Sequence, residues 1–314
     1  MNGKGKALFL CLGALLGILL GAVLSKGLYL IGTLGNPIAI YGAAAFFRVE
    51  PEEFSFFGAC LGLTLGWLAA ARMTGRKAGE TLDLIAVPGA LLIAALRFGT
   101  LYWGEIGLGE FQTLGIQNVG EGGFPAFFPL AVQDSWGDWW LAVGTLEAVF
   151  ALICALIALG VRNRYAVQPG RLFERTSLAI CAGQVFFELL HTAGTVTYFV
   201  HTEQLWCALY ILIRVIANSR AAARAGYGPK AWLAVLQAVL WIALNGVLQF
   251  VIDKPYGFLA LLPESAGDWV SDRLAPLGYG LIALSCAGLG WVALRASQRA
   301  WTATRGKDGR WEKA

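Results

Sequence analysis

A few ionisable side chains lie inside long apolar runs of the sequence, where charge is costly. They are Arg97 with Glu105, Glu147, Glu188 with His191, and Glu203 with Arg214. An arginine can hold a phosphate through two parallel hydrogen bonds, and a neighbouring carboxylate or imidazole can orient the arginine or accept a proton. A structural ion pair is an equally good reading for any single one of them. As a set, these residue types point to anion binding.

The composition indicates that lipid is the solvent around most of the chain. Hydrophobic residues make up 57% of the sequence and charged residues only 14%, whereas an average soluble domain has ~45–50% and ~25%. The mean hydropathy is +0.63. The net charge of +4 comes from basic residues at the ends of apolar runs, a distribution typical of membrane anchoring. We therefore expect a membrane environment and no nucleic acid partner.

The sequence predicts an all-α, polytopic membrane protein with about eight transmembrane helices. The expected spans are residues 7–24, 54–71, 82–102, 139–161, 173–193, 204–217, 231–251 and 276–294. The first is interpreted as a retained helix and not as a cleaved signal peptide. Residues 31–47 are interrupted by Gly35-Asn36-Pro37, so we expect them to lie partly inserted or on the membrane surface.

Charge on the connections predicts the orientation of the spans. Basic residues cluster at 72–77, 162–175, 214–230 and 295–313, which fall on one side if every span crosses once. By the positive-inside rule this side is cytoplasmic, and both termini lie there. Residues 103–138 carry acidic charges and no lysine or arginine, which predicts an extracytoplasmic cap between the third and fourth spans. Lys26, Arg48, Lys254 and Arg273 are exceptions on the outer side, mostly with acids nearby.

This topology places most of the ionisable set toward the outer halves of the helices, where we expect a polar, anion-tolerant cavity. Gly58, Gly62 and Gly66 share one helix face and are expected to let two helices approach closely. The six cysteines are isolated and show no CxxC spacing, so we expect neither disulfides nor a metal site. No cofactor is expected.

Residues 97–105, RFGTLYWGE, resemble the GRxGNFxNGE signature of the prolipoprotein diacylglyceryl transferases. Arg97, Gly99, Gly104 and Glu105 stand at the spacing of that signature. Segments around this motif occur in the same order along the chain as in the family. Residues 82–88 resemble the family's LLDLIAP, 55–62 its SFHGGLLG, and 183–191 its GxxRFxxEFxR helix, while 20–22 and 36–37 are similar to its GAR and NP segments. Gln204 stands where the last family helix has its GQ, and the resemblance covers roughly residues 15 to 218.

The resemblance implies a multi-pass protein of the bacterial plasma membrane that acts in lipoprotein biogenesis. Such an enzyme moves the diacylglyceryl group of phosphatidylglycerol onto a lipobox cysteine thiol and releases glycerol phosphate. Its partners would be phosphatidylglycerol, or a similar anionic phospholipid, and prolipoprotein signal peptides. The chain would then divide into a transferase-like membrane domain, residues 1–218, and two additional helices with a basic tail, residues 219–314.

The chain departs from the family pattern at positions that matter for catalysis. Phe57 replaces the histidine of SFHG, Thr100 the asparagine of the signature, and Gln184 the arginine of GxxRF. A phenyl ring cannot accept a proton, and a glutamine lacks the fixed charge of a guanidinium. These replacements favour a second hypothesis, a catalytically degenerate paralogue that binds lipid or a lipoprotein precursor.

For an active transferase, the resemblance implies a role for each matching residue. Arg97 would grip phosphate, and Glu105 and Glu188 would orient the arginine or its neighbours. His191, which stands where the family pattern has an arginine, would be the proton acceptor. Gly99, Gly104, Gln184 and Gln204 would line the lipid site. His201, on a short outer connection, is expected to be a solvated surface histidine. Small-solute transport is a third hypothesis, which would require inverted repeats and helices broken at the midplane.

Overall fold

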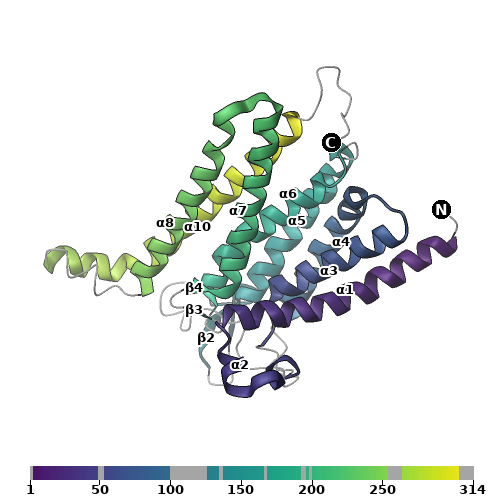
Figure 1. Cartoon of the computed structure of the whole chain (residues 1–314). Helices are drawn as coiled ribbons and strands as arrows, with labels where there is room; N and C mark the ends of the chain where they lie inside the picture. The colour runs from purple at the N-terminus through teal and green to yellow at the C-terminus, as the bar shows by residue number, and fades with distance from the viewer. Residues whose placement is uncertain are drawn as a thin grey trace. The chain divides into compact units, whose positions relative to one another are not determined.

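A computed structural model describes residues 3–48, 53–99, 126–133, 137–165, 168–191, 196–197, 200–253 and 264–303 (Figure 1). The elements are α1 (Gly3–Gly32), α2 (Asn36–Tyr41), η1 (Gly42–Phe46), α3 (Phe56–Met73), α4 (Ala78–Gly99), β1 (Ala131–Gln133), β2 (Trp139–Leu141), α5 (Val143–Tyr165), α6 (Arg171–Phe187), η4 (Glu188–Leu190), β3 (Val196–Thr197), β4 (Val200–His201), α7 (Thr202–Ala222), η5 (Ala223–Tyr227), η6 (Gly228–Ala231), α8 (Leu233–Asp253) and α10 (Glu264–Ala303).

Among the described residues, seven helices are long and apolar enough to cross a membrane: α1, α3, α4, α5, α7, α8 and α10. Large apolar side chains point outward from them, as Ile18 does on α1 and Ile157 on α5. Contiguous apolar surface of this kind is stable against hydrocarbon and unstable in water. The prediction of an all-α, polytopic membrane protein is confirmed.

The eighth expected span, residues 173–193, corresponds to α6 and η4. The helix α6 has 17 residues, and one 3-10 turn, η4, extends it. An untilted helix needs about 20 residues to cross the hydrocarbon core. The number eight therefore stays a prediction.

Residues 31–47 form two short helices, α2 and η1, in place of a span. The chain leaves α1 through a tight turn in which Leu34 and Gly35 have positive φ angles of 53° and 75°. Pro37 lies in the first turn of α2, where its missing N–H costs nothing. The expected interruption of this apolar stretch is confirmed.

The chain divides into two compact units. Unit 1 comprises Met1–Ile180, Phe187–Thr197 and His201–Glu203, and unit 2 comprises Cys181–Phe186, Tyr198–Val200 and Gln204–Ala314. The functional division predicted at residue 218 stays a prediction.

Close packing of α1 against α3 organises unit 1. A Cβ atom at Gly58 would lie 2.6 Å from the carbonyl oxygen of Leu24, and Cβ atoms at Gly62 and Gly66 would overlap the backbone of α1. Only glycine permits so close an approach. The packing role predicted for these glycines is confirmed.

Two of the basic residues expected on the outer side share an acid in unit 1. The Nζ of Lys26 lies 2.6 Å from Glu53 Oε2, and the Nε of Arg48 lies 3.4 Å from Glu53 Oε1. This confirms the expected balance for Lys26 and Arg48. Lys254 lies outside the described residues.

Most of the predicted cap lies outside the described residues. Its described part contains β1, which pairs antiparallel with β2 so that Ala131 faces Leu141. The helix α5 begins at Val143 because residues 139–141 belong to this ladder. The expected helix start at residue 139 was therefore wrong by four positions.

In unit 2, α8 packs against α10 and a buried polar contact joins them. The Nδ2 of Asn245 lies 3.2 Å from Ser285 Oγ and 3.1 Å from Cys286 Sγ. Interhelical contacts of this kind help transmembrane helices to associate, since hydrocarbon offers a polar group no other partner.

Candidate functional site

Arg97 lies in the last turn of α4 and is 8% exposed. The helix starts directly after the basic connection that contains Arg76 and Lys77. Arg97 follows Ala78 by nineteen positions, which places it about 30 Å further along the helix axis. The guanidinium is therefore at the end of unit 1 opposite that basic connection.

Asp83 positions α6 beside α4. Its two carboxylate oxygens accept hydrogen bonds from the backbone N–H groups of Gly170, at 2.8 Å, and Phe173, at 3.0 Å. These N–H groups lie at the start of α6, where a helix has no backbone acceptors of its own. Because α6 starts beside the first turns of α4 and Glu188 contacts Arg97 at the other end, the two helices run in the same direction.

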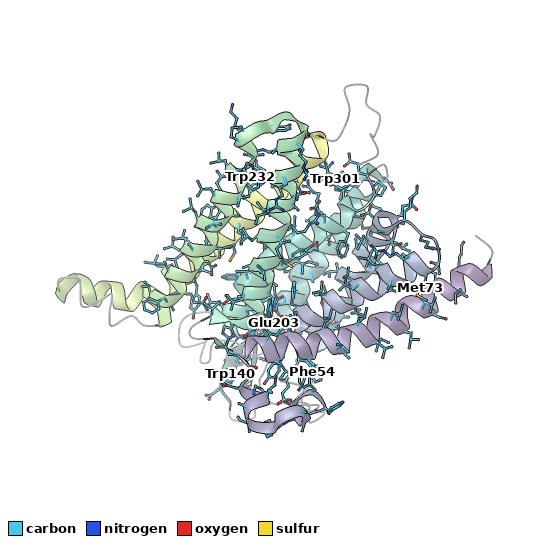
Figure 2. The ribbon with its side chains drawn as sticks, viewed as in Figure 1. Phe54, Met73, Trp140, Glu203, Trp232 and Trp301 are labelled. Atoms are coloured by element: carbon cyan, nitrogen blue, oxygen red, sulfur yellow. The ribbon has the colours of Figure 1, made fainter. Side chains whose placement is uncertain are left out.

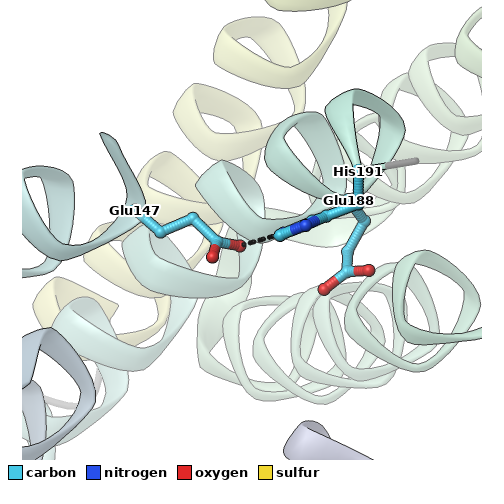
Figure 3. Close-up of side chains that lie close together, drawn as sticks. All are labelled: Glu147, Glu188 and His191. Atoms are coloured by element: carbon cyan, nitrogen blue, oxygen red, sulfur yellow. Dashed lines mark ion pairs between the residues drawn. The ribbon is translucent and has the colours of Figure 1, made fainter. Parts of the chain in front are cut away.

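Four buried side chains meet at that end of unit 1. The Nε of Arg97 lies 3.3 Å from Glu147 Oε2, and its Nη2 lies 3.3 Å from Glu188 Oε1. The Nε2 of His191 lies 3.3 Å from the other oxygen of Glu147, Oε1. Figure 3 shows the imidazole pointing toward Glu147. We call Arg97, Glu147, Glu188 and His191 the ionic cluster.

The ionic cluster balances its own charge when His191 is protonated. Two carboxylates then face one guanidinium and one imidazolium, and all four side chains are less than a tenth exposed. A buried charge is tolerated only when a partner compensates its lost hydration. Glu147 is central to this balance, because each of its two oxygens contacts a different cation.

The start of α3 also lies at this end. The guanidinium carbon of Arg97 is 4.0 Å from the centre of the Phe56 ring, a cation–π contact. The neighbouring Phe57 donates its backbone N–H to Glu203 Oε2 at 2.8 Å. Figure 2 shows Glu203 near the end of the unit where Phe54 lies and far from Met73, at the other end of α3. Glu203 thus stands beside position 57, where the family pattern has a histidine.

Three of the residues assigned roles by the resemblance come together here, namely Arg97, Glu188 and His191, with Gly99 two positions beyond Arg97 at the end of α4. Thr100, Gly104 and Glu105 lie outside the described residues. Gln184 and Gln204 are buried in unit 2, where the Gln204 amide donates to the carbonyl of Val185 at 2.7 Å.

Glu147 and Glu203 received no role from the resemblance, yet both lie in the site. The signal that identifies them in the sequence is an acidic side chain inside an apolar run. His201, expected at the solvated surface, is only partly exposed in β4. Burial lowers the pKa of the His201 imidazole.

A divalent cation is an alternative occupant for part of the cluster. Donor atoms of Glu147, Glu188 and His191 lie within 4.8 Å of one another, and carboxylate and imidazole ligands suit several metals. Arg97 already contacts both carboxylates, so a metal would have to displace the guanidinium. The geometry is therefore better described as a network of ion pairs.

The residue types of the ionic cluster are suited to binding an anion and to accepting a proton. A guanidinium can exchange a carboxylate for a phosphate, which is also negatively charged. An imidazole paired with a carboxylate can take up a proton and hold it.

Comparisons of the chain with protein-family models, with curated proteins and with solved structures give no match.

Proposed function

We propose that this protein binds the headgroup of an anionic phospholipid at the ionic cluster and transfers the lipid's diacylglyceryl group to the cysteine thiol of a lipoprotein precursor. The observation that carries the proposal is the buried guanidinium of Arg97, held between Glu147 and Glu188 beside His191. The resemblance of residues 97–105 to the diacylglyceryl transferase signature supports it from the sequence.

The proposed orientation follows from the charges at the opposite end of unit 1. Arg72 lies in the last turn of α3, and Arg76 and Lys77 lie between α3 and α4. Such residues are retained on the cytoplasmic side. Arg97 is then at the outer leaflet of a bacterial plasma membrane, where lipid headgroups and translocated precursors are both accessible. With an even number of crossings both termini are cytoplasmic.

Phosphate binding would proceed by exchange at Arg97. The lipid phosphate replaces one carboxylate on the guanidinium, so the charge next to Arg97 keeps its sign. Glu147 keeps its contact with His191 through Oε1. Bidentate hydrogen bonding to phosphate is a property of arginine that lysine does not share. The guanidinium then holds the phosphate as negative charge develops on it.

The proposed reaction needs one proton acceptor and one leaving group. His191 starts this step as the neutral imidazole: the cysteine thiol gives its proton to it, and the thiolate sulfur forms a C–S bond with the glyceryl carbon that carries the phosphate ester. The C–O bond to phosphate breaks, and glycerol phosphate leaves with the bonding electron pair on its oxygen, held by Arg97. Glu147 stabilises the imidazolium that results.

A binding protein without catalytic activity is the second candidate. It is favoured by Phe57, whose side chain can neither accept nor position a proton, and by the Glu203 carboxylate bound to the Phe57 backbone. In that case the ionic cluster would recognise the same lipid or a lipoprotein signal peptide without transfer.

Reconstitution separates the two candidates. The purified protein is placed in vesicles that contain labelled phosphatidylglycerol and a peptide with a lipobox cysteine, and diacylglyceryl peptide and released glycerol phosphate are measured. The enzyme produces both, and Arg97→Ala abolishes both. Arg72→Ala, at an exposed position at the other end of α3, is the control and leaves the yield unchanged. Lipid binding without product identifies the binding protein.

A further inference from the structure

Unit 2 contains a pocket that is separate from the ionic cluster. A cavity of about 240 Å³ lies between α8 and α10. The side chains that matter for its chemistry are Gln237 and Trp241 on α8, and Trp291, Arg295 and Arg299 on α10. Among the described residues that line the cavity, none is acidic.

The pocket changes from polar to aromatic along the helix axis. Arg299 and Arg295 lie near the end of α10, and Trp291 follows one turn deeper. Gly288 lies about 16 Å below Arg299, from the rise of an α-helix. A Cβ atom at Gly288 would lie 2.6 Å from the Trp241 indole. The glycine therefore lets this indole rest on the backbone of α10 and form the deep wall.

Further basic residues lie on the segment before α8, outside the pocket lining. Arg220, Arg224 and Lys230 follow one another along α7, η5 and η6, and η5 contacts α10 within unit 2. The sequence has no aspartate or glutamate at positions 204–252 or 274–307. Figure 2 shows Trp232 and Trp301 at the same end of unit 2, as is typical of a membrane interface. This end of unit 2 thus carries basic residues outside the pocket lining together with interfacial aromatics.

The Arg295 guanidinium is oriented by the Trp291 ring. Its guanidinium carbon lies 4.7 Å from the centre of the Trp291 ring. Stacking on an indole orients the planar guanidinium and leaves its edge to donate hydrogen bonds. Arg299 follows Arg295 by one helical turn, so the two side chains lie on the same helix face.

We propose that this pocket binds an anionic phospholipid of the cytoplasmic leaflet. The lipid phosphate lies between Arg295 and Arg299, and the glycerol backbone and the first acyl carbons lie against Trp291 and Trp241. Basic pockets between helices on the cytoplasmic side suit such headgroups. Two arginines, with no acidic side chain among the described lining residues, discriminate against a zwitterionic headgroup. The aromatic side chains deeper in the pocket discriminate against a soluble phosphate. The site is independent of the function proposed for unit 1.

Photocrosslinking tests the site directly. The full chain is reconstituted in nanodiscs of phosphatidylcholine that contain a small fraction of phosphatidylglycerol with a diazirine on its acyl chain, and the labelled peptides are mapped by mass spectrometry. Label is expected on the pocket residues of α8 and α10. The double variant Arg295→Gln/Arg299→Gln should lower this label about tenfold, the ratio expected for about 1.4 kcal/mol of lost binding.

The matched control removes two charges from the same end of unit 2. Arg224→Gln/Lys230→Gln leaves the pocket lining intact and should leave the label within about twofold of wild type, since general surface attraction is screened by salt. Equal loss in both double variants would show diffuse attraction and overturn the site. Equal labelling by a diazirine phosphatidylcholine would overturn its selectivity for anionic lipid.

Three further measurements distinguish the pocket from a folding defect, from a soluble-phosphate site and from the ionic cluster. Gln237→Trp keeps both arginines and fills the pocket mouth, so it should reduce the label even if the double arginine variant folds poorly. Unchanged label in a folded Gln237→Trp protein contradicts the proposal.

Excess glycerol phosphate should not compete with the labelled lipid, and competition by it would identify a soluble-phosphate site. Arg97→Gln should leave the label unchanged, which separates this site from the ionic cluster of unit 1.

Discussion

The Nε of Arg97 lies 3.3 Å from the Oε2 of Glu147, and both side chains are buried. This contact joins the last turn of α4 to the first turns of α5. It therefore links two helices of unit 1 and takes part in the charge balance of the candidate site at the same time. Substitutions here must be evaluated for stability as well as for activity.

Removal of Arg97 alone should destabilise the protein more than removal of Arg97 and Glu147 together. Arg97→Met leaves two buried carboxylates without their guanidinium, which costs about 3–5 kcal/mol. In Arg97→Met/Glu147→Leu one of these carboxylates is also gone, so part of the loss should be recovered. Thermal unfolding in detergent measures both. Glu147→Leu alone is measured as well, and a double variant whose loss equals the sum of the two single losses would contradict the ion-pair network.

Asp83→Ala should destabilise α6 because two backbone N–H groups at its start lose their acceptor. Loss of a helix cap costs about 1–2 kcal/mol. Hydrogen exchange of residues 171–174 should rise in this variant. Glu80→Gln on the same helix is the control, since its contact with Lys77 is largely exposed and worth less than about 1 kcal/mol. Equal effects in the two variants would show that Asp83 does not cap α6.

Gly62→Ala should weaken the packing of α1 on α3. The added methyl group would overlap the backbone of α1 at Leu20, and forced separation of packed helices costs about 1–3 kcal/mol. Gly89→Ala on α4 is a matched change at a position with nothing within 4 Å, and there alanine should be neutral or mildly stabilising. A stable Gly62→Ala protein with unchanged Tm would rule out the close approach.

Phe57→His/Gln184→Arg should raise transfer activity if the alignment with the diacylglyceryl transferase pattern is correct. The imidazole adds a proton acceptor beside Glu203, and the guanidinium restores the arginine that the family pattern has at position 184. The measurement is the yield of diacylglyceryl peptide relative to wild type. A folded double variant without a gain in activity would indicate that the proposed alignment of the site is wrong.

The helices were predictable because apolar runs of about 20 residues leave few alternatives in a membrane. The glycines of α3 were predictable for a similar reason, since their spacing places them on one helix face. The sequence did not predict β2, because strand pairing with residues 131–133 overrides the apolar character of 139–141. The length of α1 was also underestimated, since helix continues past Leu24 through Ser25 and Lys26, which looked like an end.

The members of the ionic cluster could be identified from the sequence, but their pairing could not. Arg97 was grouped with Glu105, which lies outside the described residues, whereas the structure pairs it with Glu147 and Glu188. Such long-range partners are decided by helix packing, which a local pattern does not contain. Asp83 is a similar case, because its role appears only when the start of α6 lies beside it.

Phosphate binding by Arg97 can be measured by isothermal titration calorimetry with a short-chain phosphatidylglycerol. The protein carries Arg295→Gln/Arg299→Gln, so that the pocket of unit 2 does not contribute, and it is compared with the same protein that also carries Arg97→Gln. We expect binding in the first and a loss of at least about tenfold in affinity in the second, equivalent to about 1.4 kcal/mol. Equal affinity in the two proteins would contradict the assignment of Arg97 as the phosphate-binding residue.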